Sequence, residues 1–430
     1  MSYYKRTADA LLKNLLDAFG AVLIEGPKWC GKTTTASQLA NSILRMQDPS
    51  MRAEYLVTAK TKPSILLQGD TPRLIDEWQD APMLWDAVRT TVDDRQIPGQ
   101  FILTGSNAVD KSQIHHSGVG RIAKLRMLPM SLWESQESTG EVSLKELFNN
   151  PDYDIDGKMS KMTIEDLIFA ASRGGWPASL LARTPKAQLL IAKNYVQTIC
   201  SDDISGIDGR KRDAKLTSMI LRAYARNVST LVKKKSLLDD VTSSGEVSCH
   251  VDTFDDYVAA LEKLFVIQNI SAWCPAIRSK TAIRSSVKRC FCDPSIPIAL
   301  LGLSPEALSM QLRTFGFIFE QMCIRDLKAY TIDLNSHVSY YHDRYDLEAD
   351  IVLHLEDGRY ALIECKLGSS EIDNGAEHLL ELKRLIQEHN KTEKQVPIRE
   401  PDLLIVMTGG TMAYTRPDGV KVIPLACLKD

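Results

Sequence analysis

The sequence predicts a mainly α/β protein of several domains that begins with a parallel sheet. Short apolar runs at residues 21–24, 74–75 and 101–103 each end in small or polar residues. Such runs are typical of buried parallel strands, which present functional groups at their carboxyl ends. A length of 430 residues suits about two to four domains.

Composition narrows the class of protein. Hydrophobic residues make up 44% of the chain and charged residues 25%, which is ordinary for globular domains. A net charge of -3 excludes a uniformly basic coat for nucleic acid but leaves a local basic surface open. No apolar run is long enough for a membrane helix, and residues 1–10 lack the apolar block of a secretory signal. Nine cysteines without a CxxC spacing indicate reduced thiols, so we expect a cytoplasmic protein without membrane contact.

The first apolar run leads into a phosphate-binding pattern, GxxxxGK[ST]. Its glycines let backbone N–H groups surround an anion, Lys32 would reach the β- and γ-phosphates, and Thr33 would hold Mg²⁺. A preceding strand and a helix expected from Thr33 to Leu44 supply the usual context. We therefore expect a P-loop NTPase sheet with ATP and Mg²⁺ as cofactors. The candidate nucleotide-binding residues here are Gly26, Pro27, Lys28, Trp29, Cys30, Gly31, Lys32, Thr33 and Thr34.

An acidic pair follows the second apolar run. Asp76 would bind the water shell of Mg²⁺, and Glu77 would polarise the attacking water. The pair favours NTP hydrolysis over phosphoryl transfer to a small molecule. Because no guanine-reading NKxD pattern occurs, ATP is preferred over GTP.

Polar residues after the third run are further candidates. Ser106 and Asn107 would hydrogen-bond the attacking water or the γ-phosphate, although an ordinary polar turn explains them equally well. Arg121 would neutralise charge on the γ-phosphate in cis or in trans. A surface arginine without such a role is the alternative.

These features together resemble AAA-type P-loop ATPases of bacteria and archaea that carry a C-terminal restriction-endonuclease-like domain of unknown function. The resemblance covers most of the chain. It implies Lys32, Thr33, Asp76 and Glu77 as nucleotide-site residues and a winged-helix-like middle region. Trp78 departs from the aliphatic residue more usual there, without a consequence for the chemistry. The residues that carry the resemblance are the phosphate loop and residues 75–79, 104–106, 120–122, 129–132, 174–177 and 316–320.

A second candidate site lies near the C-terminus. Asp350, Glu364 and Lys366 fit the D…ExK pattern of PD-(D/E)xK nucleases. The two carboxylates would bind Mg²⁺, and Lys366 would orient the attacking water. Glu364 and Lys366 lie two apart on an expected strand, so they share one face.

Asp350 must share that face, and this requirement constrains the turn between the strands expected at 348–355 and 359–367. A two-residue loop at 357–358 would place Asp350 opposite Cys365, whereas a three-residue loop at 356–358 places it opposite Glu364. Three-residue loops commonly end in a left-handed glycine, and Gly358 stands there. We therefore predict a three-residue, bulge-type turn.

A helical glutamate completes the metal site in the resembled nucleases, so Glu320 is a further candidate metal ligand. A solvated or capping glutamate is its alternative. A second ExK, from Glu381 to Lys383, falls on an expected helix, where residues two apart do not face together. A hairpin with an exposed carboxylate–lysine pair remains the alternative to a nuclease-like fold.

Four domains are expected: an AAA-like ATPase domain at 1–145, a helical lid or linker at 146–200, a winged-helix-like domain at 201–275 and a nuclease-like domain at 276–430. Basic residues gather between Ser205 and Lys235 and again between 276 and 292, where they would contact phosphates or form solvated or salt-bridged faces. The second group is Arg278, Lys280, Arg284, Lys288 and Arg289.

The leading functional hypothesis is Mg-ATP hydrolysis coupled to nucleic-acid binding, DNA first, with metal-dependent cleavage as a further activity. The alternative is an ATP-dependent switch or sensor whose nuclease-like domain binds DNA or a protein partner without cleaving. A P-loop kinase with an unrelated tail is a third, weaker interpretation. Oligomers are common in the resembled class, but the sequence specifies none.

Overall fold

A computed structural model describes residues 3–107, 114, 116–243, 245–273, 275, 286–343, 345–392 and 397–430. The chain divides into two compact units. Unit 1 comprises residues 1–129 and 261–265, and unit 2 comprises residues 130–260 and 266–430. The four expected domain boundaries stay predictions.

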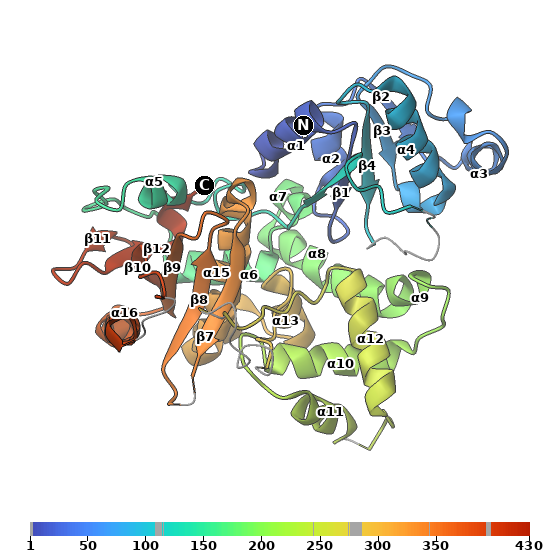
Figure 1. Cartoon of the computed structure of the whole chain (residues 1–430). Helices are drawn as coiled ribbons and strands as arrows, with labels where there is room; N and C mark the ends of the chain where they lie inside the picture. Colours follow the sequence, from blue (N-terminus) through green and yellow to red (C-terminus); the bar gives the residue numbers. More distant parts are fainter. Residues whose placement is uncertain are drawn as a thin grey trace. The chain divides into compact units, whose positions relative to one another are not determined.

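Unit 1 is built on a five-stranded parallel sheet in the order β2-β3-β4-β1-β5, which confirms the expected α/β fold with parallel strands (Figure 1). Helices pack on the sheet through a core that includes Trp78, Trp85 and Val88. Its strands are β1 (Ala21–Glu25), β2 (Ser42–Arg45), β3 (Arg73–Asp76), β4 (Phe101–Gly105) and β5 (Ile122–Arg126). Its helices are α1 (Ala8–Ala18), α2 (Lys32–Ser37), α3 (Arg52–Thr61) and α4 (Met83–Arg95).

The helix expected from Thr33 to Leu44 is wrong in its second half. Helix α2 ends at Ser37, and Ile43 and Leu44 belong to the edge strand β2. Leu44 is buried and pairs with Ile75 of β3. The apolar pair therefore lies in the sheet, where burial stabilises it more than continuation of a short helix would.

Unit 2 begins with a helical region. Its helices are α5 (Leu144–Asn149), α6 (Ile164–Arg173), α7 (Pro177–Leu181), α8 (Pro185–Thr198), α9 (Ile204–Gly206), α10 (Ala214–Arg226), α11 (Lys234–Thr242), α13 (Ser295–Leu301), α14 (Pro305–Ser309) and α15 (Leu312–Tyr330). Helix α12 (Val251–Lys263) follows α11, and its last residues fall in unit 1. Isolated antiparallel bridges then pair Ile267 with Phe291 and Ile270 with Lys288. These bridges join residues on either side of the boundary expected at 275/276.

The C-terminal part of unit 2 contains a six-stranded mixed sheet in the order β11-β12-β10-β9-β8-β7 (Figure 1). Helix α16 (Ile372–Thr392) packs on one face, where Leu362, Leu379 and Val406 belong to one apolar cluster. The strands of this sheet are β7 (His337–His342), β8 (Glu348–His354), β9 (Tyr360–Lys366), β10 (Leu403–Thr408), β11 (Tyr414–Thr415) and β12 (Lys421–Pro424). Two short strands, β6 (Val142–Ser143) and β13 (Leu428–Lys429), pair separately.

The predicted three-residue turn is confirmed. Strands β8 and β9 pair antiparallel with Ile351 opposite Ile363 and His354 opposite Tyr360. The N–H of Leu355 donates to the carbonyl of Arg359, and Gly358 has a φ of 87°. In this register Asp350 stands opposite Glu364, so the two carboxylates share a sheet face, as the turn chemistry predicts.

Replacing Gly175 with alanine is expected to destabilise the protein by about 2 kcal/mol, because a Cβ at this position would overlap backbone that cannot move freely. That Cβ would lie 2.2 Å from the Met130 carbonyl oxygen and 2.6 Å from the Met130 nitrogen. Gly316→Ala in α15 is the matched control, since a Cβ there meets nothing within 4 Å. Urea unfolding measures both variants, and equal stabilities would contradict the steric argument.

The sequence predicts reduced cysteines and no membrane-spanning helix. Among the described residues, every cysteine is a free thiol. Within the same residues, no helix combines the length and apolar character needed to span a bilayer.

Candidate functional site

The phosphate loop joins the carboxyl end of β1 to α2 and has the backbone that an anion cradle needs. Gly26 and Gly31 have φ values of 155° and 99°. A Cβ on Gly26 would lie 2.2 Å from the Met127 carbonyl oxygen, so only glycine fits there. The loop residues Pro27 and Cys30 are buried, Lys28 is half-buried, and Trp29 and Thr34 are exposed. The residues present therefore fit a nucleotide phosphate chain.

Lys32 lies inside this loop rather than in solvent. Its Nζ donates to the carbonyl oxygens of Gly26 and Pro27, at 2.9 Å each. Arg6 supports the same loop from outside, because its guanidinium donates to the carbonyls of Cys30 and Leu128, both at 2.7 Å. The sequence analysis missed Arg6. It lies in a short charged segment that carries no motif, so only its buried position identifies it.

The expected magnesium residues meet each other. The Thr33 hydroxyl donates to Asp76 Oδ1 at 2.6 Å, although 43 residues separate them. The Thr104 hydroxyl donates to the same oxygen at 2.7 Å, from the carboxyl end of the neighbouring strand β4. A hydroxyl and a carboxylate held this way fit Mg²⁺, whose preferred ligands are oxygen atoms. Thr104 is a second residue that sequence reasoning passed over, in favour of Ser106 and Asn107.

Glu77 follows β3 in a left-handed backbone conformation, with a φ of 55°. This conformation costs energy in a residue other than glycine, and such positions cluster at functional sites. Its N–H donates to the Thr104 hydroxyl at 3.2 Å. Its Oε2 accepts hydrogen bonds from Ser106 Oγ at 3.2 Å and from the side-chain amide of Gln79. These contacts hold the carboxylate beside Asp76.

Asn107 and Arg121 lie at opposite edges of the parallel sheet. Asn107 follows Ser106 at the carboxyl edge of β4, and its buried Oδ1 has no hydrogen-bond partner among the described residues. Arg121 precedes β5, whose first residue pairs with the first residue of β1, and it forms a 2.7 Å ion pair with Asp93. Since β1 and β5 run parallel, Arg121 lies at the sheet edge opposite the phosphate loop. The prediction of a role in cis is therefore wrong, whereas a role in trans stays a prediction.

At the C-terminal site, Glu364 is fully buried, and Lys366 Nζ lies 2.6 Å from its Oε2. His378 Nδ1 lies 3.7 Å from the other oxygen, Oε1. Asp350 Oδ2 instead accepts the N–H of Cys365 at 2.9 Å. Burial is the main cause that raises the pKa of Glu364 to about 8, and the Asp350 carboxylate adds to it.

Glu320 is not arranged as the third metal ligand. Lys288 Nζ lies 2.5 Å from Glu320 Oε1 and 3.7 Å from Asp350 Oδ1. Burial raises the pKa of Glu320 to about 8, while the Lys288 ammonium opposes that shift by stabilising the carboxylate. Among the described residues, no three His, Cys, Asp or Glu side chains are arranged to hold a metal ion. The expected three-carboxylate metal site is therefore corrected to a buried cluster of three carboxylates and two lysines.

The free energy of unfolding of the wild-type protein is expected to fall as pH rises, because Glu364 loses its proton. Glu364→Gln is expected to abolish this part of the pH dependence. The folded-state pKa of about 8 lies above the ordinary value of 4.5, so the folded state binds the extra proton between these values. This contribution to stability is complete below about pH 4.5 and is lost as pH rises toward about 8. Urea unfolding at the two ends of this range measures the slope.

The second ExK glutamate supplies the matched control for this slope. Glu381 lies on α16, and its hydrogen bond with Arg384 lowers its pKa. Both its folded and unfolded forms are therefore ionised over most of the range, so Glu381→Gln should leave the slope unchanged. An unchanged slope in Glu364→Gln would contradict the assignment.

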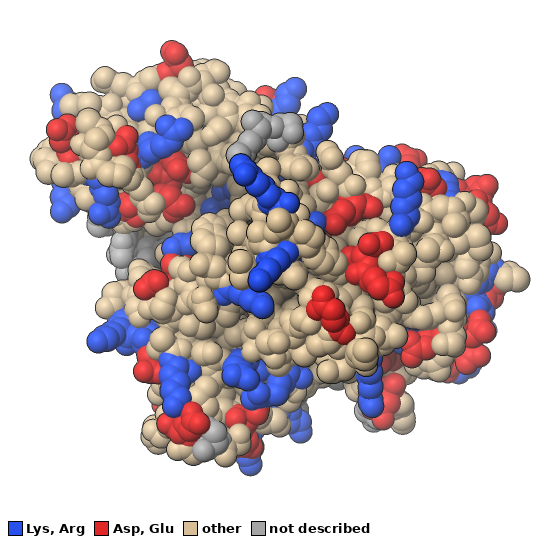
Figure 2. Space-filling model, turned by 180° about the vertical axis from the view of Figure 1, so that it is seen from behind, with Lys and Arg blue, Asp and Glu red and all other residues tan. Residues whose placement is uncertain are grey.

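The basic stretches offer less positive charge for phosphate contacts than their composition suggests. Arg212 and Arg226 form ion pairs with Asp208 and Asp240, respectively. Lys288 is buried, and Arg289 is directed to the Val232 carbonyl. Arg278, Lys280 and Arg284 lie outside the described residues. Figure 2 shows Lys and Arg interspersed with Asp and Glu on the face that it presents.

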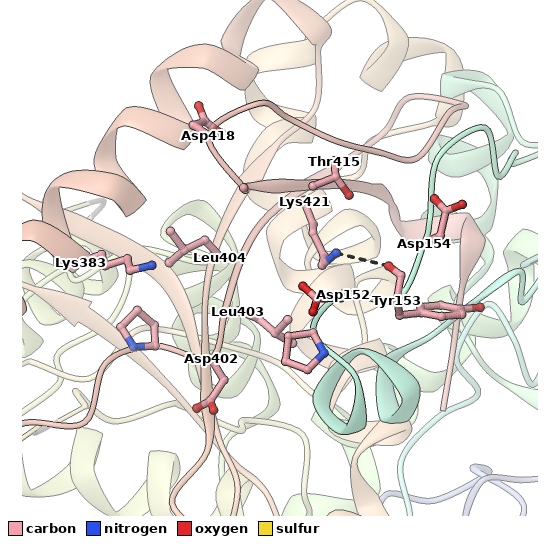
Figure 3. A pocket seen from close by; sticks show the side chains of 13 residues that line it. Asp152, Tyr153, Asp154, Lys383, Asp402, Leu403, Leu404, Thr415, Asp418 and Lys421 are labelled. Carbon is pink, nitrogen blue, oxygen red and sulfur yellow. Dashed lines mark hydrogen bonds between the residues drawn. The ribbon is translucent and has the colours of Figure 1, made fainter.

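A cavity of about 460 Å³ lies beside the β11–β12 end of the C-terminal sheet. Figure 3 shows Lys421 directed toward the Tyr153 carbonyl, with Asp152 beside it, and the Nζ–oxygen distance is 3.4 Å. Burial lowers the pKa of Lys421, while Asp152 and Asp154 oppose that shift. None of the residues that line this cavity belongs to the carboxylate–lysine cluster.

Three family models match separate parts of the chain. An AAA domain matches residues 18–136. Two domains of unknown function, DUF8612 and DUF4143, match residues 164–307 and 315–428. The first match and the phosphate-loop geometry support an AAA-type P-loop ATPase domain at the start of the chain. The C-terminal match names no activity.

Relatives and solved structures are distant. Uncharacterized proteins of Mycobacterium bovis (Mb2031c) and Mycobacterium tuberculosis (Rv2008c) are each 24% identical over 367 residues, which cover 83% of this chain and 72% of theirs. The Walker-type ATPase of Pyrococcus abyssi is 12% identical with a TM-score of 0.41, covering 70% of this chain and 96% of its own. A STAND protein with a tetratricopeptide repeat sensor from Pyrococcus horikoshii is 12% identical with a TM-score of 0.21, covering 76% of this chain and 48% of its own.

Proposed function

We propose that this chain binds and hydrolyses Mg-ATP and uses the nucleotide state to control a C-terminal module that binds nucleic acid, DNA first, or a protein partner. The contact between Thr33 and Asp76, at 2.6 Å, carries the ATPase part of the proposal. It joins the phosphate loop to the acidic end of β3, so that one hydroxyl and one carboxylate share a position for Mg²⁺.

The candidate residues of unit 1 have separate roles in ATP hydrolysis. Lys32 exchanges the Gly26 and Pro27 carbonyls for β- and γ-phosphate oxygens and neutralises their charge. Thr33 and Asp76 would hold Mg²⁺, which would supply charge neutralisation. Glu77 accepts a proton from the attacking water, and Ser106 and Gln79 orient its carboxylate.

Metal-dependent phosphodiester cleavage is the first candidate activity of the C-terminal module. The shared face of Asp350 and Glu364, with Lys366 next to them, has the pattern of a PD-(D/E)xK nuclease. Carboxylate oxygens are the type of ligand that Mg²⁺ prefers. Asp350 and Glu364 would hold the metal, which supplies a polarised water, and Lys366 would orient that water.

A non-cleaving binding module is the second candidate, and two observations favour it. Lys288 already neutralises Glu320, the expected third ligand. Helix α12 begins with two exposed carboxylates, Asp252 and Asp255, and Asp255 forms an ion pair with Lys234 at 2.9 Å. An exposed carboxylate repels phosphates, so the start of α12 does not favour a nucleic-acid contact. The geometry as a whole supports the non-cleaving switch best.

One assay tests both candidates. The full chain is incubated with ATP, with Mg²⁺ or Mn²⁺, and with labelled single- and double-stranded DNA, beside Lys32→Ala and Lys366→Ala. Phosphate release from wild type but not from Lys32→Ala supports the ATPase, and no release without an added acceptor contradicts it. Cleavage lost in Lys366→Ala establishes a nuclease. Intact DNA with active ATP hydrolysis favours the non-cleaving switch and directs the search to protein partners.

A further inference from the structure

The position of Lys288 in the carboxylate–lysine cluster was not expected from its sequence. Its backbone pairs with Ile270 through both hydrogen bonds of an antiparallel bridge, at 2.9 and 3.2 Å. Its side chain is 6% exposed. The bridge therefore fixes the position of the Lys288 backbone, and the side chain extends from it into the protein interior.

Oxygen atoms surround this ammonium as they would surround a bound cation. Nζ contacts Glu320 Oε1 at 2.5 Å and the Asp350 carbonyl oxygen at 2.9 Å, and Asp350 Oδ1 lies at 3.7 Å. The ring of Tyr340 lies 5.6 Å from Nζ, within the range of a cation–π contact. Two carboxylates from separate elements thus converge on one positive charge.

The Lys288 ammonium opposes binding of a divalent ion to the carboxylates that it already contacts. Glu320, Asp350 and Glu364 bring three carboxylates, and Lys288 and Lys366 bring two ammonium groups. An ion on Asp350 would lie within a few ångströms of the Lys288 ammonium, 3.7 Å from Asp350 Oδ1, and repulsion between the two buried positive charges would oppose its binding. The bridge to Ile270 holds the backbone of Lys288, and the contacts of Nζ with Glu320 Oε1 and the Asp350 carbonyl oxygen hold its side chain.

We propose that Lys288 is the resident cation of this cluster: its ammonium occupies the position on Glu320 and Asp350 that a divalent metal would otherwise take. The proposal rests on the second candidate function, the non-cleaving module, and names its physical cause. The wild-type cluster then binds no divalent metal. Shortening Lys288 to alanine removes the charge and leaves room, so the variant gains a divalent-cation site.

The test uses Mn²⁺ as the probe, without nucleotide, on the full chain. Electron paramagnetic resonance counts bound Mn²⁺ in wild type and in Asp350→Asn, and equal binding in the two is expected. Wild-type Mn²⁺ binding that Asp350→Asn removes would overturn the proposal. This comparison needs no substitution at Lys288, so it can overturn the proposal even where Lys288→Ala fails to fold.

Variants of Lys288 supply the positive test. Lys288→Ala should bind Mn²⁺ at least about tenfold more tightly than wild type, and its melting temperature should rise with Mn²⁺ concentration. Lys288→Met also lacks the charge but fills the space, so it should show neither effect. A folded Lys288→Ala variant whose Mn²⁺ affinity equals that of wild type would contradict the proposal. So would a gain in Mn²⁺ affinity that persists when Asp350→Asn is added to Lys288→Ala. Phosphate release measured on the same samples reports the proposed ATPase separately, so the two can fail independently.

Discussion

Replacing Glu77 with glutamine is expected to lower the rate of ATP hydrolysis by about two to four orders of magnitude, the range that a general base contributes. Glutamine keeps the shape of the side chain but cannot accept a proton from water. The hydrogen bond from Ser106, at 3.2 Å, does not need the charge of Glu77. The variant should therefore keep the site geometry and lose the proton transfer.

Phosphate release measures the rate, and a fluorescent ATP analogue measures nucleotide binding. We expect binding close to that of wild type, because Lys32 and Thr33 remain in place. Glu54→Gln is the matched control, since Glu54 is an exposed glutamate in the first turn of α3 in the same unit. A rate close to wild type would contradict the role of Glu77, and a parallel loss of binding would indicate that the loop had changed instead.

Local sequence patterns predicted the parts of the sites that depend on neighbouring residues. The phosphate loop is contiguous, and its two glycines adopt the backbone that the pattern requires. The β8–β9 hairpin was predictable for a similar reason, since loop length and Gly358 determine which residue of β8 faces Glu364. In both cases a few adjacent residues determine the geometry.

Contacts between distant segments were not predictable in this way. Lys288 reaches Glu320 and Asp350 across 32 and 62 residues, and a basic stretch gives no sign that one of its lysines is buried. Arg6 supports the phosphate loop from 24 residues away. Arg121 was misplaced because the direction of a strand relative to β1 decides which sheet edge a flanking residue occupies, and the sequence around it carries no such information.

Helix α15 contains a buried ionic network that explains two of the segments resembling the ATPase family. Arg325 forms ion pairs with Asp293 at 3.1 Å and with Asp326 at 2.6 Å. Asp326 accepts the N–H of Leu132 at 3.0 Å, and Asp293 accepts the N–H of Gly175 at 2.9 Å. Leu132 and Gly175 are therefore joined through these two aspartates, which gives residues 130–132 and 174–177 a structural role within unit 2.

Arg325→Met is expected to destabilise the protein by about 3–5 kcal/mol, because it leaves two buried carboxylates without their cation. Arg325 and both aspartates are at most 2% exposed, so water cannot replace the lost contacts. Burial already raises the pKa of Asp326 to about 6, and loss of the guanidinium should raise it further. A carboxyl whose folded-state pKa is raised loses stability as pH rises, so the penalty should be smaller near pH 5 than near pH 8.

Urea unfolding at both pH values measures this penalty, with Arg313→Met as the matched control on the exposed side of the same helix. A second variant separates charge from packing. In Arg325→Met combined with Asp293→Asn and Asp326→Asn no buried charge is left without a partner, so part of the stability should return and its pH dependence should disappear. A penalty below about 1 kcal/mol, or one that does not change with pH, would mean that the network contributes packing rather than charge compensation.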